Sequence, residues 1–236
     1  MDITIKSPSM NWKEAANGIK ISNPGLTTAG YTMRFAYIPS GKTMSLAGNQ
    51  RVIVNLLNGS LARPALEEKD CITVVQNRFI TAEKDSLVFL CIDENPDTKD
   101  MKSAISGLDL KWIEPAHGCF RTDPKLEVGN YKVNLWYLIP NKNGGIHNHA
   151  DNQDHNEGVQ FIEFHTQLRG KGCMVKYKEQ KESTEYERFE LNPGQSHPLF
   201  SKVENNIVKY PWHAYVASET GALFLVFEEI VNNLQK

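Results

Sequence analysis

The chain repeats itself, and this repeat constrains its fold more than any other feature. The stretch I-T-A-E-K-D-S-L-V-F-L-C-I-D-E at residues 80–94 aligns without a gap with Y-V-A-S-E-T-G-A-L-F-L-V-F-E-E at residues 215–229. In each copy, a short strand-like run is followed by a polar turn, an apolar run and two acids. Farther upstream, Tyr37-Ile-Pro parallels Leu138-Ile-Pro. Repetition of this kind predicts that the two halves of the chain fold alike.

The repeated segments have the composition of β-strands. Runs rich in β-branched and aromatic residues, such as Y-T-M-R-F-A-Y-I and S-L-V-F-L-C-I, are cut by Pro, Gly and Asn between residues 31 and 93. Similar runs return between residues 131 and 227. Short runs bounded in this way are typical of a β-sandwich or a β-barrel. The sequence therefore predicts an all-β protein.

Two polar segments flank the second half of the chain. The stretch 94–111 is interpreted as a linker with room for one short helix. In the tail after Phe227, Ile230, Val231 and Leu234 are spaced as on one face of a short amphipathic helix. We therefore expect one domain in residues 1–111, a second in residues 112–236, and a short helix at the C-terminus.

The overall composition excludes several classes of partner. The chain has 236 residues, a formal net charge of −2 and dispersed basic residues, which argues against binding nucleic acid. No apolar run approaches the roughly 18 residues of a membrane span, so no membrane partner is expected. The first residues do not resemble a signal peptide, which favours a cytoplasmic location. An exposed sheet edge would make a homodimer possible.

A cluster of histidines in the second half points to a metal. His147 and His149 are two residues apart, and on an extended chain such side chains point the same way. Glu163 follows in the apolar run F-I-E-F-H-T-Q-L, and His213 follows in Y-P-W-H. Three imidazoles and a carboxylate on neighbouring strands suit one divalent transition metal, namely Fe, Mn, Ni or Zn.

These residues resemble the metal-binding pattern of the cupin superfamily. His147-Asn148-His149 matches the H-x-H element of that pattern, and Glu163 followed by Gly170 matches its spaced Glu and Gly. Gly194 with Pro211-Trp212-His213 matches a stretched form of the second motif. The resemblance implies two tandem cupin-type double-stranded β-helix (jelly-roll) barrels, with His147, His149, Glu163 and His213 as ligands in the second.

The spacing within this pattern leaves the acidic ligand open. Thirteen residues separate His149 from Glu163, where the family has three or four. Further side chains that could bind the metal lie in this insertion and compete with Glu163: Asp151, Asp154, His155 and Glu157.

The repeat also predicts that the first barrel holds no metal. The stretch L-L-N-G-S-L at residues 56–61 parallels Q-L-R-G-K-G at residues 167–172. This alignment places Val52 opposite Glu163, and the longer repeat places Arg78 opposite His213. Residues 42–49, where an H-x-H element would lie, contain no histidine. The first barrel is therefore expected to have a structural role.

Other residues near these motifs are candidates for contact with a substrate. His165 and Gln167 share a strand face with Glu163, which makes them candidate catalytic residues, with His165 as the base. Four further residues are predicted to bind substrate: Trp136, His197, Trp212 and Tyr215.

The resemblance implies a metal-dependent enzyme of dioxygenase, isomerase/epimerase or lyase type that acts on a small polar metabolite. The alternative is a cupin that binds a small ligand, such as a sugar or a carboxylate, or serves a structural role without turnover. A lumen lined by Phe161 and Leu225 would favour apolar ligands. One lined by His165, Gln167 and Lys176 would favour sugars or carboxylates.

Overall fold

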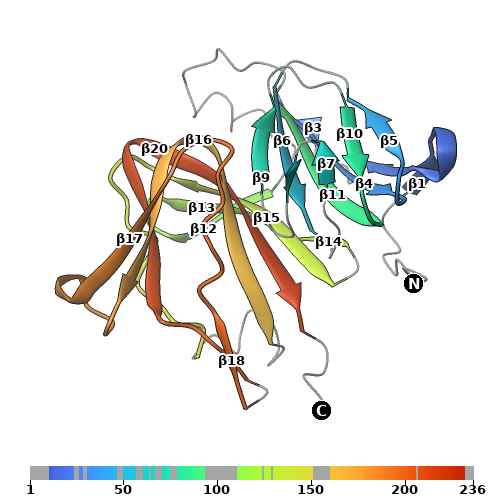
Figure 1. Cartoon of the computed structure of the whole chain (residues 1–236). Coiled ribbons are helices and arrows are strands. Elements are labelled where there is room, and N and C mark those ends of the chain that lie inside the picture. The colour runs from blue at the N-terminus through green and yellow to red at the C-terminus, as the bar shows by residue number, and fades with distance from the viewer. Residues whose placement is uncertain are drawn as a thin grey trace. The chain divides into compact units, whose positions relative to one another are not determined.

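In the described residues, the computed structural model is all-β and forms two compact units, whose main boundary lies between Lys111 and Trp112 (Figure 1). The structure describes residues 11–23, 27–28, 31–46, 50–56, 61–63, 65–66, 71–74, 79–93, 111–123, 125–128, 130–150, 160–205 and 207–231.

The N-terminal unit contains two antiparallel sheets. The larger sheet has the strand order β1-β2-β4-β11-β6-β9, with β3 paired to β4. Its strands are β1 (Asn11–Glu14), β2 (Lys20–Asn23), β3 (Thr27–Thr28), β4 (Tyr31–Ile38), β6 (Gln50–Asn55), β9 (Cys71–Val74) and β11 (Ser86–Asp93). The smaller sheet, in the order β5-β10-β7-β8, contains β5 (Thr43–Ser45), β7 (Leu61–Arg63), β8 (Ala65–Leu66) and β10 (Phe79–Ala82).

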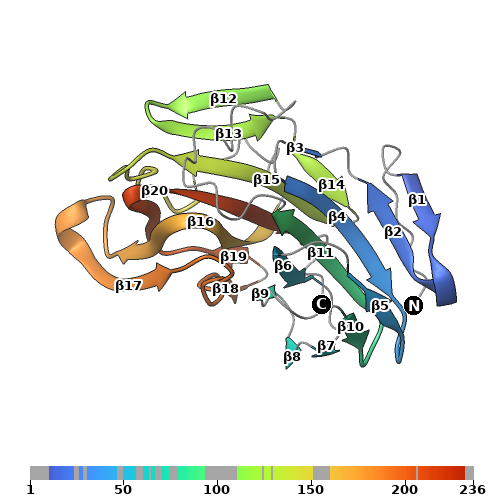
Figure 2. The same ribbon diagram turned by 90° about the horizontal axis from the view of Figure 1, so that it is seen from above.

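The C-terminal unit is built around two long strands that pair along their whole length. These are β16 (Phe161–Tyr177) and β20 (Trp212–Ile230), which run side by side in both views (Figures 1 and 2). They belong to a sheet of order β12-β13-β15-β20-β16-β17, with β14 paired to β15. The other strands are β12 (Lys111–Ala116), β13 (Cys119–Asp123), β14 (Leu126–Val128), β15 (Tyr131–Leu138), β17 (Glu185–Leu191) and the hairpin β18 (Lys202–Glu204) and β19 (Ile207–Lys209).

The two units share one topology, as the sequence repeat predicts. The order β1-β2-β4-β11-β6-β9 corresponds strand for strand to β12-β13-β15-β20-β16-β17, and β3 and β14 occupy the same side position. The register agrees too. Tyr37 pairs with Leu87, and Leu138 pairs with Ala222, which is the counterpart of Leu87 in the repeat. The all-β prediction is confirmed for the described residues, whose only helical segments are 3-10 turns at Ala16–Gly18 and Glu182–Thr184.

The register corrects one alignment made from the sequence. Glu163 pairs with Glu228, whose counterpart Asp93 pairs with Gln50, so Glu163 corresponds to Gln50 and not to Val52. The gap-free alignment anchored on glycines could not anticipate the register shifts in β16 that follow Gln167. Arg78, the predicted counterpart of His213, lies outside the described residues.

Apolar side chains pack on the inner faces of both units. In the N-terminal unit, residues of β4, β5, β10 and β11 form one cluster that includes Ile38, Met44, Ile80 and Val88. In the C-terminal unit, Leu138, Met174, Tyr215, Phe224 and Val226 belong to a cluster beside the histidines. Burial of these side chains contributes roughly 1.5–3 kcal/mol for each large residue.

Three sequence expectations have different outcomes. The predicted C-terminal helix is not found, because Glu228–Ile230 continue β20, pairing with β15 and β16. The rest of that segment, residues 232–236, lies outside the described residues, as does the helix allowed in the linker before Lys111.

No helix in the described parts of the chain is long and apolar enough to span a membrane. The domain limits 1–111 and 112–236, as independently folding domains, stay a prediction.

Candidate metal centre and cavity

The segment that carries His147 is held against the start of β20. Gly144 donates its backbone N–H to the Tyr215 carbonyl at 2.9 Å. His147 and His213 then exchange two backbone hydrogen bonds of 2.9 and 2.8 Å. This pairing places two residues that are far apart in sequence directly opposite each other, and their imidazole centroids are 4.4 Å apart.

His149 reaches the cluster through a turn, not through strand alternation. Its backbone has a φ of 58°, in the left-handed region that only a few non-glycine residues adopt. The ring then lies 4.6 Å from that of His147 and 5.0 Å from that of His213. The sequence prediction of an extended H-x-H strand is therefore wrong, although both imidazoles do reach one site.

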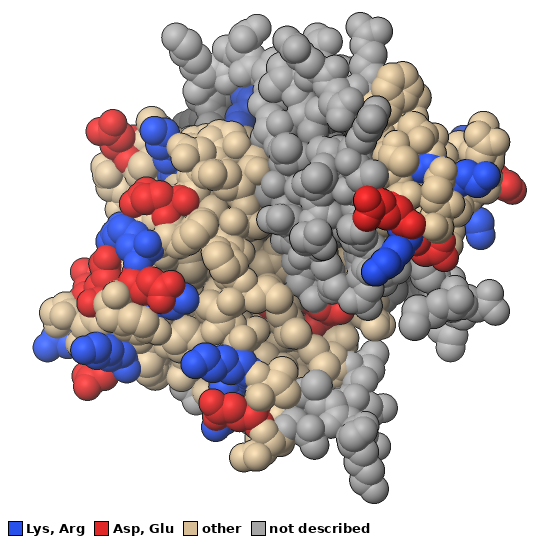
Figure 3. Space-filling view, in the orientation of Figure 1, with Lys and Arg blue, Asp and Glu red and all other residues tan. Residues whose placement is uncertain are grey.

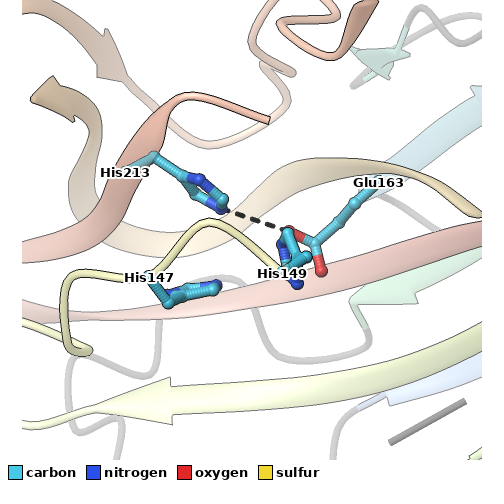
Figure 4. Close-up of side chains that lie close together, drawn as sticks. All are labelled: His147, His149, Glu163 and His213. Atoms are coloured by element: carbon cyan, nitrogen blue, oxygen red, sulfur yellow. Dashed lines mark ion pairs between the residues drawn. The ribbon is translucent and has the colours of Figure 1, made fainter. Parts of the chain in front are cut away.

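Four side chains converge at this point (Figure 4). Glu163, on β16, places Oε1 3.4 Å from His149 Nε2 and 3.9 Å from His213 Nε2. One ligand atom from each of His147, His149, Glu163 and His213 lies within 4.8 Å of the others. Ligand atoms held about 2.1 Å from a metal lie about 3.0–3.4 Å from one another, so the cluster needs only a small contraction to enclose an ion.

The hydrogen bonds of the histidines leave ligand atoms pointing inward. His147 Nδ1 donates to the Gly145 carbonyl and His213 Nδ1 donates to the Pro211 carbonyl, each at 2.9 Å. Because a carbonyl can only accept, each neutral ring carries its lone pair on Nε2. His213 Nε2 and both ring nitrogens of His149 are buried and have no hydrogen-bond partner among the described residues. Such buried atoms require a partner, and a metal ion fits this donor set.

The protonation states also suit metal ligands. Burial, together with the neighbouring His213 and His149, lowers the pKa of His147 to about 4. Burial alone would raise the pKa of Glu163, but His149, His165 and His213 outweigh it and hold that pKa well below its usual value. At neutral pH the site therefore offers a neutral imidazole at His147 and an ionised carboxylate at Glu163.

His165 lies beside this cluster and is oriented by His197. His197 Nδ1 donates to the Pro198 carbonyl at 2.9 Å, so its Nε2 is an acceptor. That Nε2 accepts from the backbone N–H of His165 at 3.1 Å and from His165 Nδ1 at 2.7 Å. His165 Nε2 is therefore left with its lone pair, 3.5 Å from Glu163 Oε1. Burial lowers the pKa of both imidazoles, that of His197 to about 4.

A cavity of about 330 Å³ opens beside the cluster. All four clustered side chains and His165 form one part of its wall, and Trp136, Tyr215 and Phe224 form an aromatic part. Arg121, Lys125 and Glu228 add charged groups. Other lining residues include Pro115, Cys119, Phe161, Met174 and Val226. The lumen is mixed, since Phe161 and His165 line it whereas Leu225, Gln167 and Lys176 do not.

The predicted substrate-binding residues fall in different places. Trp136 and Tyr215 line the cavity, and the ring of Tyr215 stacks on Phe224 with centroids 3.9 Å apart. His197 lies behind His165 and is 4% exposed. Trp212 packs against Val175, Tyr177 and their neighbours, away from the cavity lining.

Gln167, predicted as catalytic, is fully buried and does not line the cavity. It accepts a hydrogen bond from the Tyr215 hydroxyl and donates one to the Arg169 carbonyl. Its contacts are therefore those of a positioning residue. The competing ligands Asp151, Asp154, His155 and Glu157 lie outside the described residues.

Sequence reasoning missed the aromatic residues that surround the histidines. Tyr210 accepts a hydrogen bond from the backbone N–H of Glu163 at 2.7 Å and donates one to the Phe161 carbonyl at 2.8 Å. Its ring lies 4.6 Å from that of His149, and the ring of Phe200 lies 4.7 Å from that of His213. Single aromatic residues between strands are an ordinary core signal, so nothing in the sequence singled out Tyr210 and Phe200.

Comparison with known proteins gives a structural likeness only. No family model and no curated protein match the sequence. The structure is similar to a cupin barrel. It matches a cupin 2 conserved barrel domain protein from Leptotrichia buccalis at 9% identity and a TM-score of 0.33, covering 93% of this chain and 92% of that one.

The chain is also similar to solved structures of oxalate decarboxylase from Bacillus subtilis. One, described for its Mn(II) centres, matches at 10% identity and a TM-score of 0.38, covering 95% of this chain and 76% of that one. Another, at pH 4.6, matches at 11% identity and a TM-score of 0.36, covering 93% and 74%. At these TM-scores the likeness identifies neither a reaction nor a ligand.

Proposed function

We propose that this protein is a tandem cupin whose C-terminal barrel binds one divalent transition metal and acts as a metal-dependent enzyme on a small polar metabolite. The ligands are His147, His149, Glu163 and His213. The observation that carries the proposal is the convergence of these four side chains within 4.8 Å, with the inward-facing Nε2 atoms of His149 and His213 lacking any hydrogen-bond partner among the described residues.

The surrounding backbone prepares the ligands before any ion binds. The Gly145 and Pro211 carbonyls fix the tautomers of His147 and His213, and Tyr210 fixes the backbone of Glu163. Such outer contacts orient ligands and contribute to metal affinity. A bound divalent ion would supply Lewis acidity in the cavity.

His165 is the candidate general base. It lines the cavity, and the contacts from His197 leave its Nε2 free of a proton and able to accept one from a substrate. His197 acts through His165 and is therefore a positioning residue. Tyr215 and Trp136 supply the aromatic surface against which an organic substrate would lie.

A small-ligand-binding cupin without turnover is the alternative. It would need the cavity but no base. The placement of His165 in the cavity wall, oriented by a buried partner, favours the enzyme. The cytoplasmic location and the homodimer remain proposals.

The test is metal analysis of full-length protein purified without a nickel column. Wild type should contain about one equivalent of metal per chain, and His213→Ala should lose most of it. His117→Ala is a matched control, because this histidine belongs to the same unit and its side chain is 93% exposed. If His117→Ala lost metal to the same extent as His213→Ala, or if wild type took up none of the four candidate metals, the proposal would be wrong.

A further inference from the structure

The charged groups that line the cavity suggest the class of ligand that it binds. Among the described lining residues, the ionisable acids are Glu163 and Glu228 and the cations are Arg121 and Lys125. Cys119 and Tyr215 also line the cavity, and thiol and phenol groups are ordinarily neutral at pH 7. The two carboxylates balance the two cations. A divalent ion would therefore leave two uncompensated positive charges in the cavity wall.

Of the two cations, Lys125 is already paired. Its ammonium contacts Glu228 Oε1, and its side chain is only 14% exposed. Glu228 is the cross-strand partner of Glu163, so two buried carboxylates lie side by side on β16 and β20. Like charges in that position repel each other. Lys125 neutralises Glu228, which leaves Glu163 to offset one charge of a bound divalent ion.

Among the described residues, Arg121 has no such partner. It lies on β13, where it pairs in register with Trp136, and its guanidinium carbon is 5.8 Å from the centroid of the Trp136 ring. No carboxylate pairs with it among the described residues, although it lines the same cavity as Glu163. A guanidinium that is held over an aromatic face keeps its hydrogen-bonding fork free for a carboxylate.

We propose that the cavity binds a small dicarboxylate, with one carboxylate at the His147–His149–Glu163–His213 cluster and the other at Arg121. Two negative charges match the two positive charges that the wall would carry. The stacked rings of Trp136 and Phe224, with centroids 6.5 Å apart, offer an apolar surface for the carbon chain between them. This inference rests on the proposed metal site and adds to it the substrate class and Arg121 as a specificity-determining residue.

The experiment compares each dicarboxylate with its own monoamide. Succinate, glutarate and adipate are titrated calorimetrically into metal-loaded full-length protein at pH 7, alongside succinamate, glutaramate and adipamate. Each monoamide keeps one carboxylate for the metal and loses the second charge. At least one dicarboxylate should bind about tenfold or more tightly than its monoamide, because a charge-assisted pair is lost. In Arg121→Gln that preference should disappear.

Arg188→Gln is the matched control. Arg188 belongs to the same unit, but it pairs with Glu185 on β17 and does not line the cavity. It should keep the wild-type preference. Arg121→Lys, which keeps the charge but loses the fork, should retain part of the preference and serves if Arg121→Gln does not fold.

Metal content is measured on every sample, which separates the two proposals. About one equivalent of metal in wild type and in Arg121→Gln, with the preference present only in wild type, supports both. Metal in wild type, with each dicarboxylate binding no better than its monoamide, overturns the dicarboxylate proposal alone. The same holds if Arg121→Gln keeps the preference. Absence of metal from wild type overturns both.

Discussion

At the scale of single residues, Tyr215 connects the cavity wall to the buried part of β16. Its hydroxyl donates to Gln167, whose side chain is fully buried. Tyr215→Phe would leave the Gln167 carbonyl oxygen unpaired, so the free energy of unfolding should fall by about 1–3 kcal/mol in urea denaturation. Tyr186→Phe, at a side chain that is 49% exposed, should change it little. Equal effects of the two substitutions would contradict the assigned role of this hydrogen bond.

His197 should make stability depend on pH. Its folded-state pKa of about 4 lies below the ordinary 6.5, so unfolding takes up a proton between these values. The stability associated with the neutral imidazole is full above pH 6.5 and is lost as the pH falls toward 4. The loss amounts to about 3 kcal/mol at most.

Urea denaturation of chelator-treated protein between pH 7.5 and 4.5 measures this dependence. His197→Gln should show a shallower fall in stability than wild type, because it removes one titrating group. An unchanged slope would show that His197 does not titrate as the structure indicates.

The sequence predicted part of the cavity wall correctly. Strand alternation correctly put Glu163 and His165 on the cavity face. Strand alternation also predicted that Gln167 faces the cavity. A register shift follows Gln167, however, and its side chain forms hydrogen bonds with the Tyr215 hydroxyl and the Arg169 carbonyl instead. The positive φ of His149 was not predictable, since no local pattern distinguishes this turn from an extended H-x-H.

At the scale of elements, the segment 141–149 determines where His147 lies. Gly145 has a φ of 101°, a conformation that L side chains rarely adopt, and its carbonyl accepts the hydrogen bond from His147 Nδ1. Gly145→Ala should therefore displace this anchor and weaken metal affinity about 10- to 100-fold, as measured by competition with a chelator.

Gly41→Ala is the control for backbone strain. Gly41 also has a positive φ, 71°, and like Gly145 has no atom within 4 Å of an added Cβ. It lies in the N-terminal unit, so its substitution should lower stability but leave metal affinity unchanged. If both variants lost metal affinity equally, the hydrogen bond from His147 to the Gly145 carbonyl would not explain the loss.

The order of elements was more predictable than their register. A repeat in sequence implies a repeat in topology, and the two units do share strand order. The counterpart of each ligand in the N-terminal unit depends on register shifts. For this reason Gln50, and not Val52, corresponds to Glu163. The charged residues Arg121 and Glu228 line one cavity because β13 and β20 both pair with β15, and Lys125, between β13 and β14, joins them there; a linear pattern does not reveal this.

At the scale of the whole molecule, metal should belong to one unit alone. All seven histidines lie at residue 117 or later, so the N-terminal unit has no imidazole to offer. On the face shown in Figure 3, acidic and basic side chains are interspersed over the described surface, and no basic face for nucleic acid is visible there.

Removing the metal should lower thermal stability through the C-terminal unit. A ligand present at about 100 times its dissociation constant stabilises a fold by about 2.7 kcal/mol, or about 5–10 °C for a chain of this size. EDTA should therefore lower the Tm of wild type by about that amount and leave His147→Ala unchanged. If EDTA left the Tm of metal-loaded wild type unchanged, the expectation that bound metal stabilises this unit would be wrong.

The most direct test of the metal site is the location of the ion itself. Crystals of protein loaded with a single candidate metal are measured at an X-ray wavelength just above its absorption edge. We expect one strong anomalous peak per chain, bounded by His147, His149, Glu163 and His213, and none in the N-terminal unit. A peak elsewhere, or no peak between these four side chains, would contradict the proposed metal site.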